Sequence, residues 1–235
     1  MTQAVILAAG AGTRYGPALN GTAKSLLTVG GRSLLRHQVE SLRRIGVERI
    51  GIVIGHHAAL VRAEMNGVCD YIENPAYART NSLYSLWLAR EWVRGPFMLV
   101  NGDVFAPPDF YEQLASLDEC ALLYDSNSGR EPEHMKVLMS GQRLRHLSKE
   151  PSHDEIGGEN VGMTRFTTKG AEALFHAVDD LVRAGGEGGW AAAAVSHIAA
   201  EVSIRCVNVA GRPWVEIDFP EDLHYAQERV WPQWT

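Results

Sequence analysis

Asp103 is the residue whose position most directly suggests chemistry. It ends the apolar run 97–103 (FMLVNGD), which reads as a buried strand. An aspartate at the carboxyl end of a strand projects into the crevice where open parallel sheets bind their ligands. Asp103 is therefore a candidate metal ligand. The structural alternative is a cap for the following helix, a role for which Asp109 is a second candidate.

Asp218 is the second acidic residue at the end of an expected strand, 214–217 (WVEI). It stands three residues before Glu221, which is the spacing of a capping box, so periodicity alone favours a helix cap. Glu216 alternates with Asp218 along the strand, so the two side chains are expected on the same face.

A glycine-rich turn follows the first apolar run of the chain. Residues 4–8 (AVILA) predict a buried parallel strand, and residues 9–14 (AGAGTR) come next. Glycines let backbone N–H groups approach a phosphate without an intervening side chain. The turn lacks the dinucleotide pattern G-x-G-x-x-G because Tyr15 takes the third glycine position, and it lacks a Walker A pattern because Ala23 precedes Lys24. A nucleotide-phosphate site is predicted, with a turn that binds nothing as the alternative.

Strands and helices alternate in the part of the chain that would position these residues. Strands are expected at 4–8, 49–55, 69–72 and 97–100, and helices at 33–45, 58–65 and 81–92. This order predicts an α/β fold, a mostly parallel twisted sheet with helices on both faces. Further strands are expected at 135–139, 160–166, 205–209 and 214–217, and helices at 168–182, 190–200 and 220–230.

Composition narrows the classes of protein. The net charge of −6 disfavours a non-specific nucleic-acid binder, which needs surplus cations. Cys69, Cys120 and Cys206 are scattered, which argues for a reducing compartment. No apolar run is long enough for a membrane helix, and the first residues do not resemble a signal peptide. A soluble, cytoplasmic protein of one domain, 1–235, is expected.

The first loop resembles the nucleotidyltransferase signature L-A-A-G-x-G-T-R, followed by a lysine that opens a Leu-rich segment; here these are residues 7–14 and Lys24. Ala23 takes the place of the proline that usually precedes this lysine. The resemblance implies a Rossmann-like fold of the GT-A type, and it implies that Arg14 and Lys24 are catalytic cations that meet the triphosphate. It also implies that the loop backbone holds the base and phosphates, through Leu7, Ala8, Ala9, Gly10, Ala11, Gly12 and Thr13.

Two further segments resemble the phosphocholine and phosphonate cytidylyltransferases. Residues 74–86 (NPAYARTNSLYSL) match an N-P-x-Y…T-N-x-x-S-L pattern, which implies nucleotide or acceptor contacts by Asn81 and Ser82; an ordinary capped helix is the alternative. The segment around Asp218 matches a W/Y-x-E-I-D-x-x-E-D-L pattern, which implies that Asp218 joins Asp103 on Mg²⁺. Gly102 is expected beside the nucleotide. The loop sequence argues against the molybdenum-cofactor guanylyltransferases, which usually carry L-A-G-G.

The acceptor is expected to meet the second half of the chain, 126–235, while 1–125 binds the nucleotide. A basic stretch lies in the second half, and most of it is expected to be solvated: Arg130, His134, Lys136, Arg143, Arg145, His146 and Lys149. The family pattern implies acceptor contacts by Lys136, with Lys149, Trp190 and Glu216 as further candidates. Four alanines follow Trp190 where choline-type members carry an acidic residue, which favours an anionic acceptor.

The function implied by the resemblance is Mg²⁺-dependent transfer of CMP from CTP to a small phosphonate or phosphate monoester, with release of pyrophosphate. The alternatives are a phosphocholine cytidylyltransferase, a sugar-1-phosphate nucleotidyltransferase that uses UTP or dTTP, and a non-catalytic nucleotide sensor. CTP and a small anionic acceptor are the expected partners, and a homodimer is left open.

Overall fold

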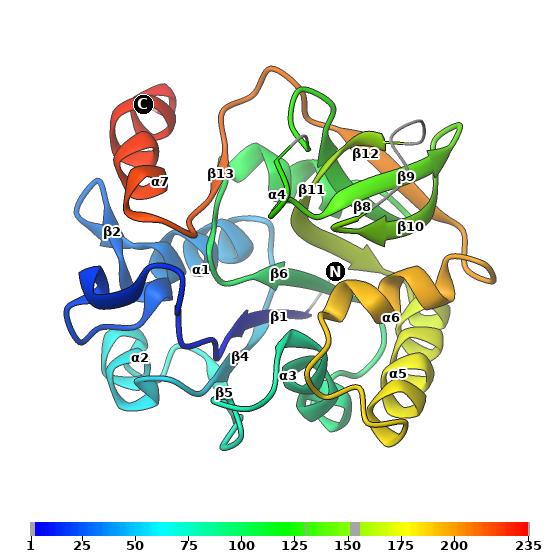
Figure 1. Ribbon diagram of the computed structural model, residues 1–235, viewed down its shortest axis with the longest axis horizontal. Helices are drawn as coiled ribbons and strands as arrows, with labels where there is room; N and C mark the ends of the chain where they lie inside the picture. The colour runs from blue at the N-terminus through cyan, green and yellow to red at the C-terminus, as the bar shows by residue number, and fades with distance from the viewer. Residues whose placement is uncertain (1–2, 130, 151–155, 235) are drawn as a thin grey trace.

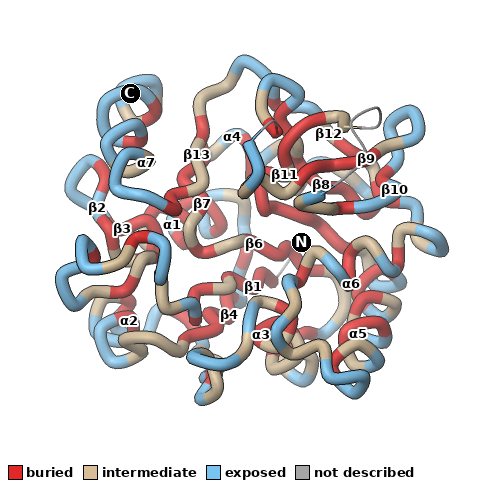
Figure 2. Tube along the Cα trace, in the orientation of Figure 1, coloured by how far each residue is buried: buried red, intermediate tan, exposed pale blue. Residues whose placement is uncertain are grey.

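Apolar side chains on both faces of the first strands make them the centre of a sheet. The computed structural model describes residues 3–129, 131–150 and 156–234. β1 (Gln3–Ala8) is buried almost throughout, and it pairs in parallel with β4 (Arg49–Ile54) and β6 (Phe97–Asn101). β5 (Asp70–Glu73) extends this parallel group at the edge beside β4. Figure 2 shows the buried stretch along these central strands.

The second half of the chain extends the same sheet with strands that include an antiparallel one. β11 (Ile156–Phe166) lies antiparallel between β6 and β8 (Cys120–Asp125), and β12 (Ile204–Asn208) runs parallel to β8. Over the described residues the sheet has nine strands in the order β5-β4-β1-β6-β11-β8-β12-β10-β9 (Figure 1). The prediction of a mostly parallel sheet therefore holds for β5, β4, β1 and β6, whereas the complete sheet is mixed.

The last strands close on themselves. β9 (Lys136–Ser140) and β10 (Arg143–Ser148) form an antiparallel pair; β10 also pairs with β12, and β9 pairs with β11. The pairings β11–β8–β12–β10–β9–β11 thus form a ring of five strands at one end of the sheet. A register shift in β11 between Asn160 and Thr164 lets one long strand belong to both the ring and the central sheet.

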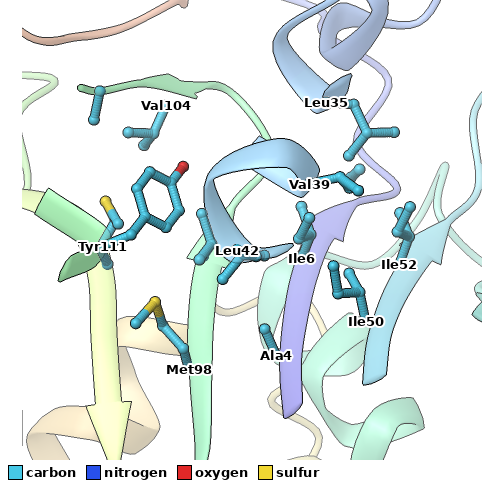
Figure 3. Packing of buried hydrophobic residues seen from close by; sticks show 14 of the residues in the cluster. Ala4, Ile6, Leu35, Val39, Leu42, Ile50, Ile52, Met98, Val104 and Tyr111 are labelled. Atoms are coloured by element: carbon cyan, nitrogen blue, oxygen red, sulfur yellow. The ribbon is translucent and has the colours of Figure 1, made fainter. Parts of the chain in front are cut away.

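Helices cover both faces, as predicted. Val5 of β1 faces one core and its neighbours Ala4 and Ile6 face the other, because successive side chains of a strand point to opposite faces. Figure 3 shows Leu35, Val39 and Leu42 of α1 packed over Ile6, Ile50 and Ile52. The helices on this face are α1 (Leu34–Arg44), α2 (Ala58–Met65) and α4 (Pro108–Ala115), and those on the other are α3 (Ser82–Leu88), α5 (Thr168–Arg183) and α6 (Ala191–Ile198).

The remaining elements are short. They are the hairpin strands β2 (Thr28–Val29) and β3 (Arg32–Ser33), the pair β7 (Val104–Phe105) and β13 (Val215–Glu216), the helix α7 (Pro220–Tyr225), a π-helical turn at Ala226–Val230, and 3₁₀ turns at Gly16–Leu19, Lys24–Leu26, Ala89–Glu91 and Trp231–Gln233. Within the described ranges, no helix has the length and apolar character needed to cross a bilayer.

Several predicted elements differ from those observed. The helix expected at 81–92 ends at Leu88 and continues as a 3₁₀ turn, and the helix expected at 220–230 changes to a π-helical turn at Ala226. Five strands were not predicted: β8, β10 and the two-residue strands β2, β3 and β7. β10 lies in the basic stretch, where its exposed Arg143 and Arg145 concealed the alternation with buried Leu144. Arg130 of that stretch lies outside the described residues.

The C-terminal segment is fixed by a cluster of aromatic side chains. Trp231 and Trp234 pack around the buried ring of His37 on α1, with ring centroids 5.2 and 5.5 Å away, and Phe105 of β7 stacks on Trp234 at 4.2 Å. Gly30 in the β2–β3 turn leaves room for Trp231, because a Cβ there would lie 2.2 Å from the indole. The segment after α7 therefore lies beside β2 and α1 (Figure 1).

We expect the free energy of unfolding to fall as the pH drops below about 6.5, in part because of His37. Burial lowers the pKa of His37 more than its hydrogen bond to the carbonyl of Val29 (2.8 Å) raises it. The unfolded chain then takes up a proton on His37 at a pH where the folded chain does not. Urea unfolding at pH values from about 7.5 to 5 should show a smaller loss of stability for His37→Gln than for the wild type. Equal slopes for the two proteins would contradict this assignment.

Candidate active site

A cavity of about 600 Å³ opens where β1 and β6 end. This volume is within the range of small-molecule sites. The glycine-rich turn forms one wall, and all of the residues predicted to bind nucleotide line the cavity: Leu7, Ala8, Ala9, Gly10, Ala11, Gly12, Thr13, Asn81, Ser82 and Gly102. Among the described residues, none of the backbone N–H groups from Gly10 to Arg14 donates a hydrogen bond to another backbone group. The turn thus offers a row of free donors to a ligand.

Lys24 joins the two aspartates at the floor of this cavity. Its Nζ lies 2.7 Å from Oδ2 of Asp103 and 2.8 Å from Oδ1 of Asp218. Arg14 adds a second cation, with a guanidinium nitrogen 2.6 Å from Oδ2 of Asp218. Burial alone would lower the pKa of Lys24, but the two carboxylates outweigh burial and raise it above its usual value. The four residues predicted as catalytic cations and metal ligands are therefore brought together.

The donor set fits a magnesium ion. Within the described ranges there is no cluster of three or more His, Cys, Asp or Glu side chains arranged to hold a metal. Mg²⁺ does not require one, since one or two carboxylates suffice when phosphate oxygens and water complete its shell. Oδ1 of Asp103 is buried without a hydrogen-bond partner among the described residues, which is costly for a carboxylate oxygen and leaves it available to a cation.

Strand pairing and the side chain of Asp222 together set the position of Asp218. β13 pairs with β7 directly after Asp103, and the N–H of Ile217 donates to the carbonyl of Asp103 at 3.0 Å. The carboxylate of Asp222 accepts hydrogen bonds from the N–H groups of Asp218 (2.8 Å) and Phe219 (2.7 Å). The capping-box interpretation of Asp218 with Glu221 is therefore wrong: Phe219 is the N-cap residue, Asp222 performs the capping, and the carboxylate of Asp218 is left for the cavity.

Asp103 does not cap a helix either. The helix that follows, α4, has Pro107 as its N-cap residue and Asp109 in its first turn, and Asp109 pairs with Arg212 at 2.6 Å. Glu216 also lines the cavity, two residues before Asp218. Burial, followed by repulsion from Asp103 and Asp218, raises the pKa of Glu216 well above its usual value.

Asn81 and Ser82 fix the entrance to α3 against the loop before α6. Oδ1 of Asn81 accepts from the N–H of Ser82 at 2.8 Å, and Oγ of Ser82 accepts from the N–H of Ala191 at 2.8 Å. Buried Asn74 holds the preceding loop through Thr80 (3.2 Å) and Ser85 (3.1 Å). The 74–86 motif thus has a structural role in addition to lining the cavity.

Two of the predicted acceptor residues meet, and one lies apart. Nζ of Lys149 lies 4.9 Å from the centroid of the Trp190 ring, and both residues line the cavity. Lys136 is not among the lining residues. Its buried ammonium donates to the carbonyls of Glu131 (2.6 Å), Pro132 (3.1 Å) and Lys149 (2.9 Å), so the structure gives it a role in holding these loops in place of the predicted acceptor contact.

Sequence reasoning missed several polar residues of the cavity wall. Asn101, Asn160 and Thr164 line it, and Oδ1 of Asn160 is buried without a partner among the described residues. Gly162, at φ +79°, makes room for the Asn101 side chain, since a Cβ there would lie 2.7 Å from Nδ2 of Asn101. A glycine inside an expected strand was the available signal, because it often marks a bulge.

The fold and the site together are those of an α/β protein with a nucleotide-type cavity at the ends of its parallel strands. The family model described as "MobA-like NTP transferase domain" matches residues 4–165, and the chain belongs to this family of nucleotidyltransferases. The prediction that it lies outside the molybdenum-cofactor branch stays a prediction.

Among curated relatives, the chain is 27% identical over 235 residues to the "Bifunctional IPC transferase and DIPP synthase" of Aquifex aeolicus, with 96% of this chain and 51% of that protein covered. It is 36% identical over 124 residues to the "CMP-5′-(3-aminopropyl)phosphonate synthase" of Streptomyces rubellomurinus, with 51% of this chain and 20% of that protein covered. The chain thus spans about half of the first relative and about a fifth of the second.

Solved structures show the same fold. The inositol-1-phosphate CTP transferase of T. maritima superposes with a TM-score of 0.78 at 22% identity, covering 98% of both chains. The CTP:phosphocholine cytidylyltransferase of Streptococcus pneumoniae superposes with a TM-score of 0.81 at 22% identity, covering 97% of this chain and 98% of that one.

The capping role of Asp222 can be tested by substitution. We expect Asp222→Ala to lower the free energy of unfolding by about 1 kcal/mol, the usual value of a lost cap. Glu221→Ala, on the same turn and exposed, should change it by less than about 0.5 kcal/mol. Chemical denaturation of both variants measures this difference. A larger loss for Glu221→Ala would restore the capping box of Asp218 and Glu221.

Proposed function

We propose that the chain transfers CMP from CTP to a small phosphate or phosphonate acceptor, with Mg²⁺ as its cofactor. The observation that carries this proposal is the meeting of Asp103 and Asp218 around Lys24, directly beside the glycine-rich turn. A metal-binding pair next to free backbone donors and two cations suits a nucleoside triphosphate.

In this reaction an anionic oxygen of the acceptor attacks the α-phosphorus of CTP. The new P–O bond forms as the bond to the β-phosphate bridging oxygen breaks, and pyrophosphate leaves. The N–H groups from Gly10 to Arg14 bind phosphate oxygens, and Arg14 and Lys24 neutralise the charge that develops on the leaving group. The protein supplies position and charge, and no side chain needs to act as a general base.

Asp103 and Asp218 would hold the metal, and Glu216 of β13 lines the same cavity. When bound there, Mg²⁺ supplies charge neutralisation and orientation of the triphosphate oxygens.

The acceptor lies, in this proposal, between Lys149, Trp190 and the five-stranded ring. An acceptor with a quaternary ammonium group would have to share the face of Trp190 with the ammonium of Lys149, which lies 4.9 Å from that ring. Two cations on one aromatic face repel each other, whereas an anionic phosphonate or phosphate pairs with Lys149. This contact favours a small anionic acceptor over phosphocholine.

The test is pyrophosphate release from each nucleoside triphosphate with a panel of phosphonates, phosphocholine and sugar 1-phosphates, with and without Mg²⁺. We expect turnover with CTP, Mg²⁺ and a phosphonate or small phosphate monoester. Asp103→Asn and Asp218→Asn should each lower kcat about 100-fold or more, since each removes a charged ligand of the metal that would neutralise the triphosphate. Asp118→Asn, a matched change at an exposed aspartate, should leave kcat unchanged.

Other outcomes discriminate among the alternatives. Turnover of sugar 1-phosphates with UTP or dTTP would replace the proposal by a sugar nucleotidyltransferase, and preference for phosphocholine would overturn the acceptor assignment. Tight CTP binding with no release of pyrophosphate for any acceptor would indicate a nucleotide sensor.

A further inference from the structure

We infer that Lys24 and Arg14 keep free divalent cations out of the Asp103–Asp218 pair, so that the metal enters this site together with the nucleotide. The inference rests on the proposed function for the identity of both ligands. It concerns a second role of the two cations, in addition to binding the triphosphate.

The geometry of the ion pairs is the first observation. One ammonium lies within 2.8 Å of an oxygen of each aspartate, and Arg14 holds the other oxygen of Asp218 at 2.6 Å. The side chain of Lys24 is 15% exposed and that of Asp218 is 10% exposed, so solvent screens these contacts poorly. Lys24 therefore already occupies the carboxylate oxygens of both residues that would hold the metal.

Charge balance is the second observation. Asp103 and Asp218 carry two negative charges, and Lys24 and Arg14 carry two positive charges, so the four side chains sum to zero. A divalent cation that approaches this group alone meets no net attraction from it. To bind, the ion would have to displace the ammonium of Lys24 from both aspartates. The two cations would then lie close together with little solvent to screen them, and this arrangement is unfavourable.

A triphosphate removes this obstacle. Its oxygens can accept the hydrogen bonds of Lys24 and Arg14, and the glycine-rich turn that begins beside them offers free N–H groups for the same phosphates. Once the two cations turn to the nucleotide, Asp103 and Asp218 are free for the metal. Oδ1 of Asp103, which has no partner among the described residues, then gains one. Metal and nucleotide should consequently bind with positive coupling.

The experiment measures binding of Mn²⁺ to the full chain by electron paramagnetic resonance, with and without a non-hydrolysable CTP analogue. For the wild type we expect Mn²⁺ alone to bind at least about tenfold more weakly than Mn²⁺ with the analogue, a common size for coupling between ligands. Lys24→Met should tighten the binding of Mn²⁺ alone about tenfold, and adding Asp103→Asn to it should abolish this gain. Arg14→Met, whose side chain is 44% exposed, should give a smaller gain in the same direction.

Lys169→Met is the control, since Lys169 is an exposed lysine on α5 away from the cavity; its Mn²⁺ affinity should equal that of the wild type. Unchanged or weaker binding of Mn²⁺ alone in both folded variants, Lys24→Met and Arg14→Met, would overturn the inference. If Lys24→Met does not fold, the Arg14→Met result decides. Failure of the proposed function is distinguishable, because the wild type would then bind no Mn²⁺ even with the CTP analogue and would release no pyrophosphate.

Discussion

The attraction between one buried ammonium and two carboxylates connects the parts of this protein that matter for its site. Lys24 comes from the segment after the glycine-rich turn, Asp103 from the end of β6, and Asp218 from the segment after β13. Without a cation between them, the two carboxylates would repel each other strongly, because solvent screens their charges poorly at this buried site. The ammonium of Lys24 offsets this repulsion and holds the two carboxylates together in the cavity.

Several weaker contacts together hold the C-terminal segment beside Lys24 and Asp103. The β7–β13 pairing places residue 217 opposite Asp103, and Asp222 holds the backbone on either side of Asp218. Beyond them, Trp231 and Trp234 pack with side chains that flank Lys24 in sequence, such as Leu19 and Leu27. One apolar cluster therefore fixes both the segment with the lysine and the segment with the second aspartate.

The second half of the chain departs most from what sequence patterns predict. Continuous apolar runs predicted the parallel strands, and apolar residues at helical spacing predicted the helices α1 and α5, because each pattern depends on neighbouring residues only. The ring of β8 to β12 depends on pairings between distant segments, and exposed arginines obscured β10. Lys136 shows the same limit: a lysine in a basic stretch looks like a surface cation, yet its ammonium is buried among three carbonyls.

The sequence by itself determined the glycine-rich turn, the apolar strand that ends at Asp103 and the cations Arg14 and Lys24, because strand burial and turn chemistry are local properties. The residue pattern around Asp218 left open whether it joins Asp103 or caps a helix, and the tertiary structure decided this. From its neighbours in the sequence, Asp218 could cap the last helix or face the cavity. Which of the two occurs depends on whether another side chain accepts hydrogen bonds from the free N–H groups at the start of α7. Asp222 does so, and the carboxylate of Asp218 is therefore free to meet Lys24, 194 positions away in the chain.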